Sequence, residues 1–578
     1  MADTILQLDC GEKVEMVRLS GYPSIDKPWL KYYSEEAINM KLPQKTMYEY
    51  AWENNKNHPK DIVFSYYRKK TTYEQFFDNV RNAVKALHFK GIKKGDIVTV
   101  MSMHTPETIY LIYALNYLGA VSNMVYMTLS ENEVLHTITN TESKLFFVLE
   151  PAIPTIEKIR DEIKIPVVVM PISDSMPVHI RTLYRIKNRT NKHYDIYKAF
   201  INSGLRNDLP PMETDHEALA TIVYTSGTTG EPKGVMLSND GLNALVSQDV
   251  HGIIVFRRKL KYLFMLPPFT GYGFALLHVG ISAGLELQLQ IDLNPNKVAD
   301  ALFKNKTECF CAGPAFVDAI LNHSASNLDR LEYFICGGGE ISKDKEMEIN
   351  RFLRDCKAKA TYSNGYGMTE ACSVLCTNCN QISKISSLGI PFVKTTIKVV
   401  DTETGEELTY RKQGELLFNT PALMVGYYKN DEATEKTIIR DRDGKLWLRT
   451  GDIGYVDEDG FVFMSGRLKR IYYVRAGIGE ICRLFPSHIE EVIEKSEFVT
   501  NCAVIVREDN EKISVPIAYV TLSEKAKVCE TEKIIEELHK LTKRDLPDHM
   551  QLFDIIVLND MPITQSGKID YRMLEYKE

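Results

Sequence analysis

The stretch that decides the fold reads Tyr224-Thr225-Ser226-Gly227-Thr228-Thr229-Gly230-Glu231-Pro232-Lys233-Gly234. It follows an apolar run, residues 218–223, which predicts a buried strand. After it, the polar residues 238–240 predict the cap of a helix that begins near Gly241. Glycines let a backbone approach a ligand closely, hydroxyl groups donate to phosphate oxygens, and Lys233 adds positive charge. We interpret the loop as a phosphate-binding loop, with a flexible surface turn as the alternative.

The loop differs from the Walker type of phosphate-binding loop. That type requires Gly-Lys-Ser/Thr after four intervening residues. Gly227 and Lys233 have the required separation, but Pro232 occupies the glycine position and Gly234 follows the lysine. A proline has no N–H group to offer a phosphate, and its φ is fixed. The sequence therefore disfavours an ordinary P-loop kinase or GTPase.

The same eleven-residue loop resembles the signature of the adenylate-forming superfamily of AMP-dependent synthetases and ligases. That superfamily contains acyl-CoA synthetases, firefly luciferase and the adenylation domains of peptide synthetases. The resemblance extends from about residue 46 to residue 572, and it implies that the loop binds the phosphates of ATP. The residues expected to do so are Thr225, Ser226, Gly227, Thr228, Thr229, Gly230 and Lys233.

Composition restricts the class of protein. A chain of 578 residues exceeds one ordinary domain, and 44% hydrophobic with 25% charged residues is typical of a globular protein. The net charge of −7 gives no excess of positive charge that would indicate nucleic-acid binding. The first 18 residues lack a signal-peptide pattern, and eleven cysteines without such a signal indicate free thiols, so we expect a cytoplasmic protein. Residues 108–129 predict a buried helix and strand rather than a transmembrane segment.

Strands and helices alternate through the first part of the chain and predict an α/β fold with parallel strands. From Ile397 onward, short strands between Gly and Asp turns predict a small β-rich subdomain. The resemblance implies a large N-terminal AMP-binding domain, residues 1–467, and a mobile C-terminal α+β lid, residues 468–578. A basic segment, residues 181–192, is either a solvated connection, which we favour, or a patch that touches an anionic membrane.

A second signature occupies residues 364–370 and reads Asn-Gly-Tyr-Gly-Met-Thr-Glu. The resemblance implies that Tyr366 stacks on adenine, that Thr369 contacts the α-phosphate, and that Glu370 holds Mg²⁺. A hard cation with oxygen ligands bridges phosphate oxygens and offsets charge in the transition state. Further residues expected to bind ATP are Gly338, Gly365, Gly367 and Met368.

Three later motifs complete the family pattern. Asp452 ends a Trp-Leu-Arg-Thr-Gly-Asp motif, and the resemblance implies that its carboxylate accepts hydrogen bonds from both ribose hydroxyls. Arg467 would lie near the ribose or the phosphates, with Lys469 as the hinge. Near the C-terminus, Lys568 lies in a Pro-Ile-Thr-Gln-Ser-Gly-Lys-Ile frame and resembles the catalytic lysine of the family; a lone lysine would otherwise be solvated surface.

The acid-binding region is expected to be apolar. Thr270 stands where amino-acid-activating domains carry an aspartate, so the resemblance disfavours amino-acid substrates. The expected acyl pocket consists of Phe269, Thr270, Tyr272, Gly273 and Gly313, whose mainly aromatic and small side chains favour a fatty or other apolar acid.

Two departures bear on the function. Cys372, Cys376 and Cys379 have a spacing that also occurs around iron–sulfur clusters, but they directly follow the second signature, so we favour free thiols. After the hinge, Tyr473 replaces an expected lysine and His488 a frequent glutamate, which weakens the prediction for the second half-reaction.

The resemblance implies an acyl-CoA synthetase that uses ATP, Mg²⁺ and CoA to activate a small carboxylic acid. One alternative is an acyl-AMP ligase that loads the phosphopantetheine of an acyl carrier protein. A second alternative is a homologue that binds a nucleotide or acyl group without turnover.

Overall fold

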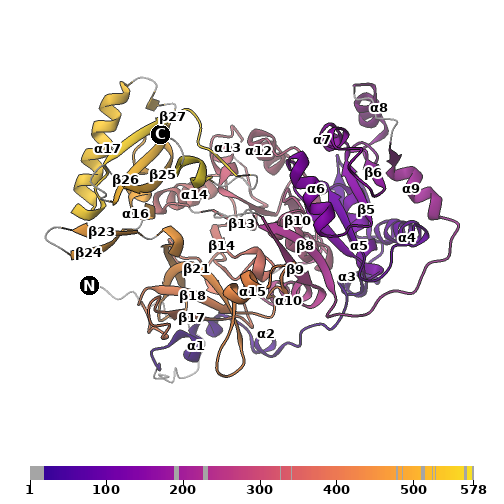
Figure 1. Ribbon diagram of the computed structural model, residues 1–578, viewed down its shortest axis with the longest axis horizontal. Coiled ribbons are helices and arrows are strands. Elements are labelled where there is room, and N and C mark those ends of the chain that lie inside the picture. Colours follow the sequence, from indigo (N-terminus) through magenta and orange to yellow (C-terminus); the bar gives the residue numbers. More distant parts are fainter. Residues whose placement is uncertain are drawn as a thin grey trace.

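The computed structural model describes residues 19–187, 194–225, 232–254, 256–325, 327–339, 341–470, 472–476, 480–484, 486–508, 514–523, 525–526, 529–564 and 569–575. The molecule is elongated. Most residues between 47 and 204 lie at one end and those beyond 480 at the other, whereas residues 23–39 lie beside residues 396–400, as Figure 1 shows.

One sheet contains the strand that enters the phosphate-binding loop. Its strands are β3 (Ile97–Met101), β4 (Val121–Val125), β5 (Leu145–Leu149), β6 (Val167–Met170), β7 (Asp195–Ile196), β8 (Leu219–Thr225), β9 (Lys233–Ser238) and β19 (Gly426–Tyr427). Their order is β19-β9-β8-β4-β3-β5-β6-β7, parallel from β8 to β7. Strand β4 is buried throughout, as in parallel sheets covered on both faces. The expected helix and strand within residues 108–129 are confirmed as α5 (Pro106–Tyr117) and β4.

The surroundings of the loop correct one expectation. We expected a strand, the loop and then a helix, but the loop joins β8 to the antiparallel strand β9. Apolar residues after Lys233 pair with β8, and only then does the chain enter α10 (Asn239–Val250). The expected cap is confirmed, because the Ser238 side chain accepts a hydrogen bond from the Gly241 N–H at 3.1 Å.

A second sheet lies beside the first. Its strands are β1 (Ile62–Tyr66), β2 (Lys69–Thr72), β10 (Lys261–Phe264), β11 (Glu286–Leu289), β12 (Cys309–Ala312), β13 (Tyr333–Gly337), β14 (Tyr362–Tyr366), β15 (Cys376–Thr377) and β16 (Ile390–Pro391). Their order is β16-β15-β14-β13-β12-β10-β11-β1-β2. Strands β1 and β10 to β14 are parallel.

Buried helices fill the space between the two sheets. Helix α11 (Gly271–Ser282) contacts β8 of one sheet and β11 of the other, and it packs on α10 and on α3 (Met47–Asn55). Helix α4 (Tyr73–Phe89) begins with a capping box of Thr72 and Gln75. The other α-helices in the first 355 residues are α1 (Pro23–Asp26), α2 (Glu35–Asn39), α6 (Glu131–Asn140), α7 (Ile153–Lys158), α8 (Val178–Lys187), α9 (Tyr197–Gly204), α12 (Pro295–Lys304), α13 (Val317–Leu321) and α14 (Lys343–Asp355).

Helices α5 and α8 overlap the two segments for which the sequence raises the question of membrane contact. None of the helices in the described ranges is long and apolar enough to cross a membrane. The basic segment overlaps α8, where Val178 and Leu183 are exposed, and its residues 188–192 lie outside the described ranges. The membrane contact of that segment and the cytoplasmic location stay predictions.

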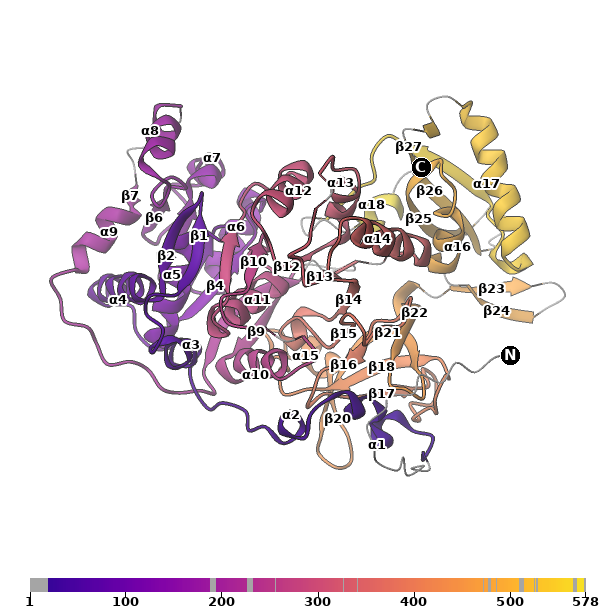
Figure 2. The same ribbon diagram turned by 180° about the vertical axis from the view of Figure 1, so that it is seen from behind.

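The expected β-rich subdomain is confirmed. It consists of β17 (Thr396–Val400), β18 (Gly414–Asn419), β20 (Ile438–Arg440), β21 (Leu446–Val456) and β22 (Val462–Arg467), together with α15 (Asp431–Thr437). All pairings in this sheet are antiparallel. In Figure 2 this subdomain lies between the nine-stranded sheet and the C-terminal elements.

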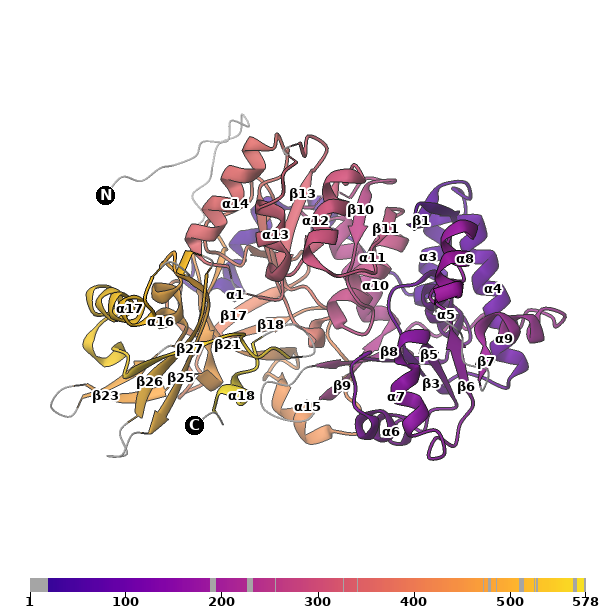
Figure 3. The ribbon, with the colours of Figure 1, turned by 90° about the horizontal axis from the view of Figure 1, so that it is seen from above.

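The C-terminal part is an α+β unit. It contains β23 (Tyr472–Ala476), β24 (Glu480–Leu484), β25 (Val499–Glu508), β26 (Ser514–Leu522), β27 (Asp554–Leu558), α16 (Pro486–Ile493), α17 (Thr531–Asp545) and α18 (Tyr571–Glu575). Helix α18 lies on the side of this unit that faces the rest of the molecule (Figure 3). The predicted class, a large α/β domain followed by a smaller α+β domain, is confirmed, whereas the exact boundary after residue 467 stays a prediction.

Candidate active site

The carboxyl ends of parallel strands from both sheets open into one cleft. Its volume is about 2850 Å³, and its walls include residues of the C-terminal unit such as Glu490 and Tyr571. In open α/β sheets, ligands bind outside the carboxyl ends of the strands, where successive loops converge. Strands β8, β10, β12, β13 and β14 all end at this cleft.

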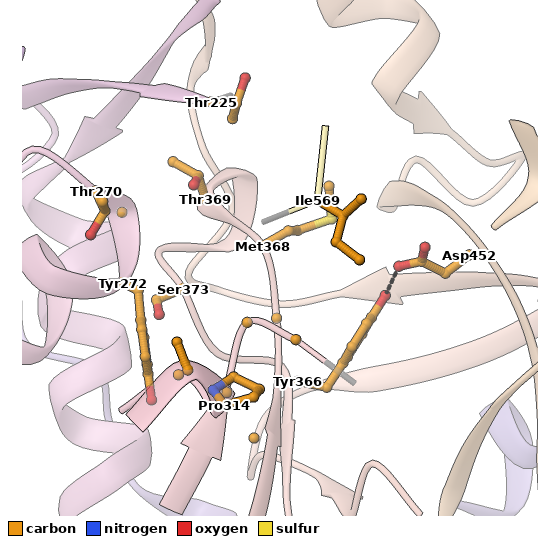
Figure 4. Close-up of a pocket in the computed structure, with 18 of the residues that line it drawn as sticks. Thr225, Thr270, Tyr272, Pro314, Tyr366, Met368, Thr369, Ser373, Asp452 and Ile569 are labelled. Atoms are coloured by element: carbon orange, nitrogen blue, oxygen red, sulfur yellow. Dashed lines mark hydrogen bonds between the residues drawn. The ribbon is translucent and has the colours of Figure 1, made fainter. Parts of the chain in front are cut away.

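Most of the residues selected from the sequence meet here. Those that line the cleft are Thr225, Lys233, Gly338, Gly365, Tyr366, Gly367, Met368, Thr369, Glu370, Asp452, Arg467, Phe269, Thr270, Tyr272 and Gly313. The predictions for Ser226, Gly227, Thr228, Thr229, Gly230 and Lys568, and the side chain of Lys469, lie outside the described residues. Ile569, which follows Lys568 in the sequence, lines the cleft and is drawn in Figure 4.

Asp452 and Tyr366 form a buried pair at one end of the cleft (Figure 4). The Tyr366 hydroxyl donates to Asp452 Oδ2 at 2.6 Å, and Asp452 is 3% exposed. Burial, and secondarily the Asp452 charge, raise the pKa of Tyr366, so the phenol keeps the proton that it donates. The Arg467 Nε lies 3.1 Å from Asp452 Oδ1, which accepts no hydrogen bond of normal geometry within the described structure. This carboxylate therefore retains acceptor capacity that fits a ribose diol.

Glu370 is held by a tyrosine from a distant strand. The Tyr427 hydroxyl, on β19, donates to Glu370 Oε1 at 2.6 Å, and Glu370 is 6% exposed. Among the described residues, Oε2 accepts no hydrogen bond, so a carboxylate oxygen remains for a hard cation such as Mg²⁺. The Lys233 Nζ lies 4.9 Å from the centroid of the same Tyr427 ring. Tyr427 thus links the lysine of the phosphate-binding loop to the acidic residue of the second signature.

Glu415 orients the turn before Asp452. It is 2% exposed, receives hydrogen bonds from Arg449 on both carboxylate oxygens, and accepts the Gly451 N–H at 3.2 Å. Gly451 has a φ of +68°, which a side chain would strain. Sequence analysis missed both Tyr427 and Glu415, because neither belongs to a motif and both act through contacts with residues far away in the chain.

Helix α11 begins against the second signature and contributes Tyr272 to the expected acyl pocket. A Cβ atom at Gly271 would lie 2.7 Å from the Thr369 Cγ2, so the helix starts directly against the second signature. The Thr270 hydroxyl donates to the Pro267 carbonyl and accepts the Gly273 N–H, and it is thereby occupied as a helix cap. Gly273 differs from our expectation that it belongs to the acyl pocket. It does not line the cleft, and it is glycine because a Cβ atom there would lie 2.0 Å from the Pro267 oxygen.

The three clustered cysteines are separate, buried thiols. Burial raises the pKa of Cys379 to about 12 and also raises the pKa values of Cys372 and Cys376. No group of three or more His, Cys, Asp or Glu residues in the described ranges has the arrangement of a metal site.

Known proteins resemble this chain over most of its length. The AMP-binding enzyme family matches residues 51–428, and the AMP-binding enzyme C-terminal domain matches residues 488–568. A long-chain-fatty-acid–CoA ligase of Bacillus subtilis is 26% identical, over 96% of this chain and 98% of that protein. A 4-coumarate–CoA ligase of Humulus lupulus is 25% identical, over 88% of each.

Solved structures share the fold. The structure of o-succinylbenzoate coenzyme A synthetase from Bacillus subtilis, in complex with ATP and magnesium ion, superposes with a TM-score of 0.74 at 21% identity, over 92% of this chain and 99% of that one. Because the first family match spans more than half of the chain, this protein belongs to the AMP-binding enzyme family of adenylate-forming enzymes.

Proposed function

We propose that the protein activates a carboxylic acid with ATP and transfers the acyl group to the thiol of CoA. The observation that carries this proposal is the pair of buried carboxylates, Asp452 and Glu370, each held by a tyrosine in the same cleft. The relatives support it, since they are ligases that join a fatty acid or 4-coumarate to CoA.

Each of the candidate site residues has a separate role in the first half-reaction, the formation of the acyl-adenylate. Asp452 binds the ribose hydroxyls and Tyr366 stacks on the adenine, while the loop from Thr225 to Lys233 binds the β- and γ-phosphates. Glu370 holds Mg²⁺, which offsets negative charge on the phosphates. An oxygen of the acid attacks the α-phosphorus, the bond to the bridging oxygen breaks, and pyrophosphate leaves. Lys568 stabilises the charge that develops on these oxygens.

The second half-reaction requires the C-terminal unit to move. The CoA thiol releases its proton to solvent, its sulfur attacks the carbonyl carbon of the acyl-adenylate, the bond from this carbon to the phosphate oxygen breaks, and AMP leaves. We propose residues 1–467 as the AMP-binding domain and 468–578 as a lid that rotates about Lys469. Arg470 couples this hinge to the lid, because it donates to Glu490 at 2.6 Å and lies 3.9 Å from the Tyr571 ring centroid.

The acid binds beyond Thr369, against Phe269, Tyr272 and Gly313. These aromatic and small groups suit an apolar carbon skeleton, as in a fatty or aryl acid. A carrier-protein phosphopantetheine is the alternative acceptor, because Tyr473 and His488 depart from the residues expected in related synthetases, and this departure weakens the prediction for the second half-reaction.

The test separates the two half-reactions. Lys568→Ala should abolish pyrophosphate exchange while thioester formation from preformed acyl-adenylate continues. Equal loss of both reactions would contradict the roles assigned here, and no pyrophosphate release from any acid would leave a binding protein without turnover. Supplying CoA or a holo-carrier protein to the wild-type enzyme and comparing the yield of thioester identifies the acceptor.

A further inference from the structure

The acyl end of the cleft contains two buried polar groups that make no hydrogen bond of normal geometry in the described structure. Asp249, in the last turn of α10, lines the cleft, is 3% exposed, and has a buried Oδ2 that accepts no hydrogen bond in the described structure. Tyr262, on β10, also lines the cleft and is 3% exposed; its hydroxyl makes no hydrogen bond of normal geometry there and has the Cys311 thiol as its polar neighbour. Buried polar groups are nearly always paired with protein or with a ligand.

A series of contacts leads from the reacting atoms to these groups. Helix α11 starts against Thr369, and its next residue, Tyr272, reaches Cys311 through a hydrogen bond between hydroxyl and thiol. Tyr262 pairs with Cys309 on the neighbouring strand, and Cys311 lies two residues farther on the same face. Burial raises the pKa of Cys311 to about 12, against the lowering effect of the Tyr272 and Tyr262 hydroxyls, and the nearby Asp249 adds a smaller raising contribution. Asp249 and Tyr262 therefore lie at the end remote from Thr369.

The chemistry of this end favours a neutral hydrogen-bonding ligand. Burial alone raises the pKa of Asp249 from 3.8 to about 8, so the carboxyl group is mainly protonated at neutral pH. A protonated carboxyl and a phenol can each donate and accept a hydrogen bond. An ammonium group would have to lose its hydration among aromatic rings and thiols, which is costly. The free-energy cost of removing a hydroxyl group from water is far smaller.

We infer that the acid carries a hydroxyl group at the end remote from its carboxylate, and that Asp249 and Tyr262 bind this hydroxyl. The inference rests on the proposed function and narrows its substrate class to hydroxylated aryl or alkyl acids. The carbon skeleton of the acid contacts the apolar lining of the cleft, which includes Ile254, Phe256 and Val279.

Specificity follows from the groups left unpaired. An acid without the hydroxyl excludes water from the closed site and leaves both polar groups buried without partners. A site built to bind a substrate hydroxyl discriminates strongly against the analogue that lacks it. We expect kcat/KM for the hydroxylated acid to exceed that of its matched analogue by at least about tenfold.

Matched pairs of acids test the inference. Pyrophosphate release is measured with cinnamate and 4-hydroxycinnamate, with 3-phenylpropanoate and 3-(4-hydroxyphenyl)propanoate, and with octanoate and 8-hydroxyoctanoate. At least one hydroxylated member should be preferred by the wild-type enzyme. Asp249→Leu should remove that preference, Tyr262→Phe should reduce it about three- to tenfold, and Asp249→Asn, which keeps a donor and an acceptor, should retain most of it.

The ratio within a pair distinguishes recognition from folding, because a folding defect lowers both rates equally. Glu107→Gln is the control variant, since Glu107 is also a buried carboxyl with an unpartnered oxygen but lies away from the cleft; it should leave the ratio unchanged. Equal or greater activity with every acid that lacks the hydroxyl would overturn the inference and leave the proposed function intact. A preference for 8-aminooctanoate would also overturn it, and inactivity with every acid would overturn both.

Discussion

Buried carboxyl groups differ in their hydrogen-bond partners between the two ends of the cleft. At the nucleotide end, Glu370, Glu415 and Asp452 each accept hydrogen bonds from side chains of other segments. At the acyl end, Asp249 is just as buried and has no such partner among the described residues. Fixed partners orient the first set before any ligand arrives, whereas the acyl end is completed by the ligand. The predictions below test this difference.

Glu370→Gln should have the largest effect. The amide keeps the shape of the side chain but removes the charge that would hold Mg²⁺, so the rate of pyrophosphate exchange should fall about 10²–10³-fold. Tyr427→Phe, which leaves the carboxylate and removes only its hydrogen bond, should cost about tenfold. Steady-state exchange at saturating Mg²⁺ measures both. A Glu370→Gln enzyme within threefold of wild type would show that the carboxylate holds no metal.

Asp452→Asn should raise the KM for ATP by about ten- to a hundredfold, because a charged acceptor of the ribose hydroxyls is lost. The wild-type enzyme should discriminate against 2′,3′-dideoxy-ATP by a similar factor, and the variant should not. If Asp452→Asn still discriminated between the two nucleotides as the wild type does, another residue would have to bind the ribose.

The sequence could predict the residues that belong to contiguous motifs. Glu370 and Asp452 were identified because their neighbours in the chain form a recognisable pattern. Tyr427 escaped prediction because its contact with Glu370 spans 57 positions and exists only after β19 has joined the sheet. Asp249 escaped because a Ser-Gln-Asp run normally faces solvent on a helix, and only the packing of α10 buries it.

The parallel sheets were predictable from apolar runs, but the conformation of short segments was not. The residues after Lys233 form β9 because they pair with β8, a non-local interaction that periodicity does not report. Gly273 was assigned to the pocket by its place in the motif, whereas its glycine is required by the approach of the Pro267 carbonyl.

The stability of the protein should depend on pH through Asp249. Its pKa is about 8 in the folded protein and 3.8 when unperturbed, so between these values the folded state retains a proton that the unfolded state has released. Stability is therefore lost as the pH rises through this window, by about 1.4 kcal/mol between pH 6 and pH 7. Asp249→Asn should lack this contribution, which urea denaturation of both proteins at the two pH values measures.

Glu107 provides the control for that measurement. Burial raises the pKa of Glu107 to about 7, so its contribution has the same sign but is largely complete near neutral pH. Between pH 7 and pH 8, Asp249→Asn should therefore alter the pH dependence more than Glu107→Gln does. The reverse order would mean that Asp249 is ionised in the folded protein and paired with a cation.

Removing a single hydroxyl at each end gives the closest comparison of the two ends, and Tyr262→Phe should have the smallest effect. Tyr366→Phe deletes a hydrogen bond to the Asp452 carboxylate and should lower the free energy of unfolding by about 1.5–3 kcal/mol. Tyr262→Phe deletes a hydroxyl that makes no hydrogen bond of normal geometry, so the change should stay within about 0.5 kcal/mol or be slightly stabilising. Thermal unfolding of both variants without ligand measures the difference. Equal losses would mean that the Tyr262 hydroxyl is already paired within the protein, and the acyl end would then need no hydroxyl from its substrate.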